Sequence, residues 1–300
     1  MIKIHPIQTG VVQVKRAQKR RRLGGLLRTL TDQDWSEWLP IYAWLIEHPE
    51  GLFLVDTGET ARTKEADYFP SWHPYFRWAM KTRVELDEEV GPQLRSIGVE
   101  PEEIDTVIMT HLHTDHAGGI RYFPGSRFLV SPDELGRAGG FLGKLRGYLP
   151  DHWPEWFRPD DPAEGVVRKI GPFYPCHSVT TDGAIAILPT EGHTPHHISV
   201  LVSTPEMRYL LAGDASYSQV ALLNQRPDGV SPAPFAAKRT LRQILALASS
   251  KPMVYLPSHD PEAVERLENR EPIPGAQAAG ALLTGHAGGQ RELATVIRGS

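Results

Sequence analysis

Short apolar runs separated by polar, turn-forming stretches recur along most of the 300-residue chain. Runs rich in β-branched and aromatic residues, each bounded by turn residues, predict β-strands. These runs cover residues 41–46, 52–55, 106–109, 127–130, 184–188, 198–202 and 209–211. Helices are predicted over 84–97, with an interruption at Gly91-Pro92, and over 132–137, 234–248 and 261–270. Two series of strands with helices between and after them predict an α+β fold, a four-layer αββα sandwich in which helices cover the outer faces of two sheets.

Two segments depart from this pattern. Residues 139–162 hold an unusual set of aromatic side chains among Gly and Pro: Phe141, Tyr148, Trp153, Trp156 and Phe157. This aromatic insertion could form a lid over a substrate, a subunit contact or a satellite core, and the three readings stay open. Residues 271–300 are rich in Gly and Ala without an amphipathic period, so we expect a flexible tail after one catalytic domain over 1–270.

Composition narrows the class of protein. With 40% hydrophobic residues, 23% charged residues and a net charge of −4, the chain is typical of a globular protein with no general attraction to nucleic acid or membranes. The basic stretch 15–22 favours a solvated face over docking to phosphate or lipid. Cys176 is the only cysteine, which excludes an intrachain disulfide and a cysteine-ligated zinc finger. No signal-peptide pattern and no long apolar run is present, so we expect a cytoplasmic protein.

Metal-binding side chains are concentrated directly after the predicted strand 106–109. The run T-H-L-H-T-D-H-A-G-G contains His111, His113, Asp115 and His116. Imidazole and carboxylate are the ligands expected for zinc and its first-row neighbours. The small residues after them let the backbone turn tightly beside a metal. Ligands this close together on one turn can serve two different ions.

Three further candidate ligands each follow a short apolar run of strand character: His193, Asp214 and His259. Loops at the ends of strands converge at one rim of a layered scaffold, where site residues gather. Together with the packed run, these residues predict one site for two divalent metal ions. Zinc suits the ligands best, and Mn, Fe and Co are the alternatives.

The motifs T-H-L-H-T-D-H-A-G-G, E-G-H-T-P-H-H, G-D-A and S-H-D, with L-V-D-T-G before them, resemble the metal motifs of the metallo-β-lactamase superfamily in order and spacing. The resemblance runs from Ile41 to Arg270 and implies an αββα sandwich with a metal cleft at the top of its two sheets. It implies one ion held by His111, His113 and His193, a second held by Asp115, His116 and His259, and Asp214 as the bridge. It also implies that Asp56 supports the site from beneath.

Within the superfamily, the chain most resembles the N-acyl homoserine lactonases, which open the lactone of bacterial quorum-sensing signals. They place a Tyr three residues after the bridging Asp, as Tyr217 stands here after Asp214. A phenol there can donate a hydrogen bond to the lactone carbonyl oxygen, although a packing role is the alternative. The implied reaction is attack of a metal-bridging hydroxide on the ester of a small-molecule substrate, with Asp115 or Asp214 passing a proton.

Two departures from the lactonase pattern leave the substrate open. His196 replaces the usual Gly of G-H-T-P-G-H, beside His197, which matches the motif, and the aromatic insertion enlarges the segment before His193. A glyoxalase-II-like thioesterase would need a larger C-terminal domain than the residues after His259 provide. A phosphodiesterase or organophosphate hydrolase would need an Arg or Lys clamp beside the metals.

A non-enzymatic sensor with this fold would have an incomplete ligand set, whereas all seven candidates are present. The resemblance also implies a homodimer. Trp35, Trp38 and the aromatic insertion offer apolar surface for one, and the same residues would suit a core.

Overall fold

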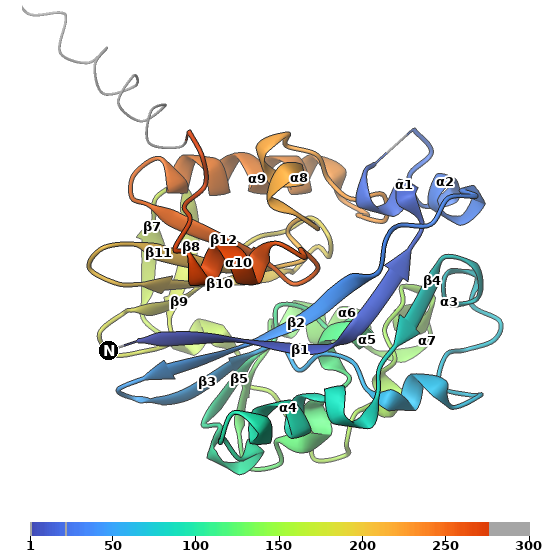
Figure 1. Cartoon of the computed structure of the whole chain (residues 1–300), viewed down its shortest axis with the longest axis horizontal. Helices are drawn as coiled ribbons and strands as arrows, with labels where there is room; N and C mark the ends of the chain where they lie inside the picture. The colour runs from blue at the N-terminus through green and yellow to red at the C-terminus, as the bar shows by residue number, and fades with distance from the viewer. Residues whose placement is uncertain (1, 22, 276–300) are drawn as a thin grey trace, which may run out of the picture.

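The computed structural model describes residues 2–21 and 23–275, which form two six-stranded sheets packed face to face (Figure 1). The first sheet, in the order β4-β1-β2-β3-β5-β6, contains β1 (Lys3–Val14), β2 (Leu39–His48), β3 (Gly51–Val55), β4 (Met80–Arg83), β5 (Thr106–Ile108) and β6 (Arg127–Leu129). The second, in the order β12-β11-β10-β9-β8-β7, contains β7 (Val167–Ile170), β8 (Phe173–Ser178), β9 (Ile185–Pro189), β10 (Ile198–Ser203), β11 (Arg208–Gly213) and β12 (Met253–Pro257).

Mostly short helices connect these strands, and α9 is the longest of them. The helices are α1 (Arg16–Lys19), α2 (Gly25–Thr31), α3 (Pro74–Trp78), α4 (Val90–Ser96), α5 (Thr114–Ala117), α6 (Pro132–Ala138), α7 (Gly140–Leu145), α8 (Gln219–Leu223), α9 (Pro234–Ala248) and α10 (Ala263–Glu268). Among the described residues, none of these helices has the length and apolar character needed to cross a membrane.

Both sheets are apolar on both faces because each is covered on both sides. Along β2, Ala43 and Leu45 pack in the cluster that includes α4, whereas Trp44 points into the cluster between the sheets. Along β9, Ile187 joins the cluster between the sheets and Leu188 packs with α9. This alternation is the period of two of a β-strand. In Figure 1, α9 lies above the two sheets and α4 below them, which confirms the predicted αββα sandwich.

Each strand in the predicted set is present within two residues of its expected bounds, and α9 has the bounds expected from the sequence. β1, β4, β7 and β8 were not predicted. β1 is interrupted by Pro6 and Gly10, and its pairing with β2 and β4 replaces the missing apolar pattern. The helix predicted over 84–97 begins only at Val90, because Pro92 lies in its first turn, where its missing amide proton costs nothing.

The aromatic insertion divides between core and surface. Tyr148 and Phe157 are buried in the cluster on the outer face of the first sheet, whereas Phe141 is 66% exposed and Trp156 41% exposed. The first two therefore fit the core reading, and a lid or a subunit contact stays a prediction. The predicted tail over 271–300 lies outside the described residues beyond Gly275 and also stays a prediction.

Candidate metal centre

The loop after β5 and the helix α5 that follows it carry four of the seven predicted ligands. β5 pairs in parallel with β3 and with β6, so the loops that follow these strands leave the same edge of the sheet. α5 begins immediately after His113, and the backbone N–H of His116 donates to the His113 carbonyl at 3.1 Å. This tight turn places two ligands before the helix and two within it.

Asp56 supports that loop from the turn after β3, as the family resemblance implies. Its φ of 61° lies in the left-handed region, which Asp tolerates better than most residues. Its carboxylate accepts hydrogen bonds from the N–H and the hydroxyl of Thr110 at 2.7 and 2.8 Å, and from Nδ1 of His116 at 2.8 Å. These bonds orient the His116 ring and leave its Nε2 atom for another partner.

Gly213 lets β11 end close against the loop that follows β5. Its φ is 53°, and a Cβ atom at this position would lie only 2.8 Å from Nε2 of His197 and from the side chain of Thr110. The next residue, Asp214, donates its backbone N–H to Nε2 of His197 at 3.0 Å. His197 is therefore a buried support for Asp214, whereas the side chain of His196 is 37% exposed.

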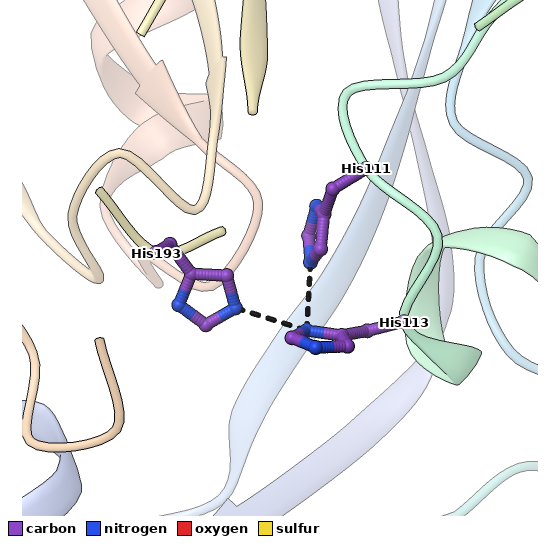
Figure 2. Close-up of side chains that lie close together, drawn as sticks. All are labelled: His111, His113 and His193. Atoms are coloured by element: carbon purple, nitrogen blue, oxygen red, sulfur yellow. Dashed lines mark hydrogen bonds between the residues drawn. The ribbon is translucent and has the colours of Figure 1, made fainter. Parts of the chain in front are cut away.

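The three imidazoles predicted to share one ion meet in the structure (Figure 2). Nδ1 of His113 lies 3.1 Å from Nε2 of His111 and 3.1 Å from Nε2 of His193. A ring nitrogen has one lone pair or one proton, so it cannot make two good hydrogen bonds to other imidazoles. The ligand atoms of a tetrahedral zinc ion lie about 3.3 Å apart, given zinc–nitrogen bonds of about 2.0 to 2.1 Å. A shared cation would satisfy all three nitrogens.

The second predicted triad lies against the first. Nε2 of His259 is 3.4 Å from Oδ2 of Asp115, and Nε2 of His116 is 3.9 Å from Oδ1 of the same carboxylate. Asp214 stands between the triads: its Oδ2 is 3.3 Å from Nε2 of His193, while its Oδ1 is 3.5 Å from His116 and 3.4 Å from His259. One carboxylate oxygen thus faces each triad, as a bridging ligand requires.

The seven residues, named here the ligand cluster, fit a pair of divalent ions: His111, His113, Asp115, His116, His193, Asp214 and His259. Nε2 of His116 and Oδ1 of Asp214 are buried and have no hydrogen-bond partner among the described residues. Leaving such atoms unpaired costs about 1 to 3 kcal/mol each, and more for charged groups. A cation between them would remove that cost, and nitrogen and oxygen donors in this number suit zinc or its first-row neighbours.

Burial and close contact between imidazoles and carboxylates shift the pKa values in the cluster in both directions. Burial lowers the pKa of His113 to about 3, which keeps its ring neutral and ready to bind metal. Burial raises the pKa of Asp115, but the nearby His116 and His259 more than offset this and lower it to about 2. Burial likewise lowers the pKa of His193, yet the carboxylates of Asp214 and Asp228 raise it to about 9. The buried carboxylates and imidazoles are therefore close enough to shift each other's pKa values.

Second hydrogen bonds fix the rings of the cluster. Nδ1 of His193 is 3.2 Å from Oδ2 of Asp228, and Nδ1 of His259 is 2.8 Å from the carbonyl of Pro40. Such contacts select the tautomer that presents Nε2 to a metal. The sequence analysis missed Asp228. It belongs to a Pro-Asp-Gly turn that carries no spacing signal relative to His193, and only the fold brings the two together.

Glu134 is a second buried support that the sequence does not reveal. From α6 it accepts hydrogen bonds from the N–H of Leu112 at 3.4 Å, the hydroxyl of Tyr148 at 2.8 Å and the hydroxyl of Thr194 at 2.9 Å. These donors belong to the β5–α5 loop, the aromatic insertion and the loop after β9. One carboxylate thus joins three segments that surround His113, whose ring centroid is 4.9 Å from that of Tyr148.

Tyr217 lies in the same cavity as the ligand cluster. Its side chain is buried, and its ring centroid is 6.1 Å from that of His193 and 5.4 Å from that of His259. These two rings belong to different triads, so the phenol stands beside both predicted ion positions. The cavity has a volume of about 220 Å³ and is also lined by His113, Asp115 and Asp214.

The comparison with protein families agrees with the fold and the site. The model of the Metallo-beta-lactamase superfamily matches residues 36–259, most of the chain. The chain therefore belongs to the metallo-β-lactamase superfamily, as its motifs predict, and the relatives that it matches are hydrolases.

Curated relatives give a finer comparison. The chain is 25% identical over 244 residues to the N-acyl homoserine lactonase AttM of Azorhizobium caulinodans, covering 75% of this chain and 83% of the relative. It is 27% identical over 227 residues to an N-acyl homoserine lactonase of a Bacillus species, covering 75% and 82%.

Solved structures share the fold. One is an N-acyl homoserine lactone hydrolase with N-hexanoyl-L-homoserine at its catalytic metal centre, with a TM-score of 0.69 and 21% identity over 88% of this chain and 95% of that one. Another is AidC, a dizinc quorum-quenching lactonase, with a TM-score of 0.61 and 15% identity over 87% and 88%. At these identities the likeness concerns the fold.

Proposed function

We propose that this protein is a dinuclear metal-dependent lactonase that opens N-acyl homoserine lactones or related lactones, and that zinc is its metal. The position of Tyr217 carries the proposal. Its phenol stands beside one imidazole of each triad and reaches the cavity that the ligand cluster lines. The lactonase relatives support the substrate class, since they are named for this reaction.

The side chains divide the chemistry of ester hydrolysis. Two bound ions would acidify a water molecule and polarise the ester carbonyl. As the carbonyl carbon gains the water oxygen, Tyr217 donates a hydrogen bond to the carbonyl oxygen, on which negative charge builds. The ring C–O bond then breaks, and the departing oxygen takes up the proton that the water lost.

Asp115 is the better of the two predicted carriers for that proton. Both carboxylates line the cavity, but the side chain of Asp115 is 17% exposed, whereas that of Asp214 is only 3% exposed. A carboxylate with access to the substrate can accept the proton and release it. Asp214 is fixed in the bridging position by contrast.

The rest of the cavity suits an apolar substituent on the lactone. Its lining includes a set of apolar side chains that pack together in one buried cluster: Val12, Val14, Leu39, Phe76 and Met80. An acyl chain that packs against them would be removed from water, which favours binding by about 0.8 kcal/mol of free energy for each buried methylene group. Polar ligands at one end and apolar side chains at the other match an amphiphilic ester.

A phosphodiester or organophosphate is the second candidate substrate, since Arg137 and Arg146 also line the cavity. These cations are the feature that a phosphate clamp needs. Arg146 uses one guanidinium N–H to bond the carbonyl of Arg137 at 3.2 Å, so at least part of this group is already engaged.

The test is a metal analysis followed by assays of one preparation with four substrates: an N-acyl homoserine lactone, a simple lactone, a thioester and a phosphodiester. The proposal predicts two ions per chain and preferred turnover of the acyl homoserine lactone. Selective cleavage of the phosphodiester would contradict it and favour the second candidate.

A further inference from the structure

A buried amide joins two phenols at the wall of the cavity. Gln18, in α1, is 2% exposed, and its Nε2 group donates hydrogen bonds to the hydroxyl of Tyr217 at 2.9 Å and to the hydroxyl of Tyr75 at 2.8 Å. All three residues line the cavity, as five of the seven residues of the ligand cluster do: His113, Asp115, His193, Asp214 and His259. Because both hydrogen bonds share the Nε2 atom of Gln18, the distance between the two phenol oxygens cannot exceed the sum of the two bond lengths. We name Tyr75 and Tyr217 the phenol pair.

The backbone around Gln18 is anchored to the same site. The carbonyl of Gln18 accepts the N–H of Gly229 at 2.7 Å, next to Asp228, which bonds His193. The N–H of Ala17 donates to the carboxylate of Asp32 at 2.7 Å. The backbone that carries the Gln18 side chain is thus held from both sides. Gln18 lies within the basic stretch 15–22, so this part of the stretch faces the cavity.

The hydroxyl groups of Tyr75 and Tyr217 donate no hydrogen bond within the described residues. Each hydroxyl oxygen accepts from Gln18, and neither has another partner within residues 2–21 and 23–275. A hydroxyl that accepts a hydrogen bond becomes a stronger donor through its own proton, because neighbouring bonds polarise one another. The cavity therefore offers two strengthened donors, of which the proposed reaction uses only Tyr217.

Tyr75 lies between the reacting centre and the apolar side chains. Its ring packs against the cluster that contains Phe76 and Met80, while its hydroxyl shares one amide with Tyr217. A substrate whose ester lies at Tyr217 and whose chain reaches that cluster passes the Tyr75 hydroxyl between the two. A carbonyl group at that point of the substrate would find a hydrogen-bond donor.

We propose that Tyr75 is a specificity-determining residue that donates a hydrogen bond to a second carbonyl of the substrate, placed between the lactone ring and an apolar chain. Gln18 is the positioning residue that holds Tyr75 and Tyr217 at the spacing of the two carbonyls. This inference rests on the proposed lactonase function, and it defines the substrate class as acylamino or acyloxy lactones rather than plain alkyl lactones.

The experiment compares an N-acyl homoserine lactone with an alkyl γ-lactone of equal chain length, which lacks the second carbonyl. Tyr75→Phe removes only the hydroxyl. We expect the ratio of kcat/KM for the acyl homoserine lactone to kcat/KM for the alkyl lactone to fall by about three- to tenfold, mainly through KM, as the loss of one hydrogen bond predicts. An unchanged ratio would overturn the role of Tyr75.

Gln18→Met keeps the length of the side chain and removes the amide. We expect it to lower kcat for both lactones, with metal content unchanged, and to have no further effect on the alkyl lactone in a Tyr217→Phe background. Equal effects in both backgrounds would mean that Gln18 does not act through Tyr217. If Gln18→Met does not fold, Gln18→Asn shortens the side chain and is tested in the same cycle.

Gln243→Met is the matched control, because it removes one amide hydrogen bond, to the Pro172 carbonyl at 3.1 Å, from α9. It should leave unchanged both kcat for the two lactones and the ratio of their kcat/KM values. Failure of the wild-type enzyme to open either lactone would instead contradict the proposed function, which separates the two outcomes.

Discussion

The ligand cluster and the phenol pair share one cavity but are built in different ways. Four of the cluster's residues come from the run His111–His116, and the others follow the ends of separate strands. The phenol pair combines Tyr75 of α3 with Tyr217 of the loop after β11, and a third segment contributes Gln18 to join them. Strand ends position the first group, and one side-chain amide positions the second.

This difference separates two functions within the site. The cluster is held by buried carboxylates such as Asp56 and Asp228, whose loss should alter metal binding. The phenol pair contacts Gln18 through hydroxyl oxygens that need not touch an ion, so its loss should alter kinetics at constant metal content. Measurements of metal content and turnover on the same variants therefore test whether the two groups are independent.

The largest effect is expected from Asp214→Asn. The substitution keeps the shape of the side chain but removes the charge that faces His116, His193 and His259. We expect loss of at least one ion per chain and a fall in kcat/KM of about a thousandfold or more. Elemental analysis and kinetics measure both. The control Asp182→Asn changes an exposed carboxylate beside His48 and should keep full activity. If the Asp214→Asn variant retains both ions, Asp214 is not the bridging ligand.

Tyr217→Phe should have the next largest effect, and on turnover alone. Loss of a hydrogen-bond donor to a developing oxyanion lowers kcat by about a hundredfold. Metal content should match the wild type, because the phenol oxygen bonds Gln18 rather than a ligand of the cluster. Unchanged lactone kinetics would remove Tyr217 from the mechanism. A loss of bound metal would mean that the phenol pair also contributes to metal binding.

Smaller and more selective effects are expected from the two supporting carboxylates. Asp228→Asn weakens the bond to His193, and Asp56→Asn weakens the bond to His116 while keeping a residue that tolerates positive φ. Each should reduce the affinity of its own ion by about ten- to a hundredfold. Competition with a chelator would show one weakened site per variant. Equal weakening of both ions in each variant would mean that the triads are not separate.

The smallest expected effect is a pH dependence of metal binding. The carboxylates beside His193 raise its pKa to about 9 from an ordinary 6.5, so below that pH the metal-free ring carries a proton. Metal binding must release that proton, and affinity should therefore rise with pH up to about 9. In the metal-free protein, the stabilising ion pair is complete below the ordinary pKa and is lost as pH rises through 9. Calorimetry in buffers of different ionisation enthalpy counts the protons, and no release at pH 7 would contradict this account.

Sequence reasoning could predict the ligand cluster because its signal is local. His111, His113, Asp115 and His116 are close along the chain, and apolar strand patterns mark the ends that precede His193 and Asp214. The continuous apolar runs of β2 and β9 likewise predict strands that are covered on both faces of their sheets. Apolar runs and strand-end positions are properties of short segments, so they can be read without the tertiary structure.

Three of the supports, Gln18, Glu134 and Asp228, could not be predicted, because their partners lie far away in sequence. Gln18 meets Tyr217 across 199 positions, and Glu134 meets Thr194 across 60. Asp228 lies in an ordinary turn until the fold brings it to His193. β1 was missed for a related reason, since pairing with β2 and β4 stabilises it despite its mixed pattern. Contacts of this kind depend on tertiary packing, which overrides local propensity.

The most direct test of the central claim is a metal titration of the stripped enzyme with lactone opening as the readout. Two ions held by the ligand cluster and bridged by Asp214 predict that opening of an N-acyl homoserine lactone reaches its full rate only when two equivalents of zinc are bound per chain. A full rate at one equivalent, or two bound equivalents without lactone opening, would contradict the account.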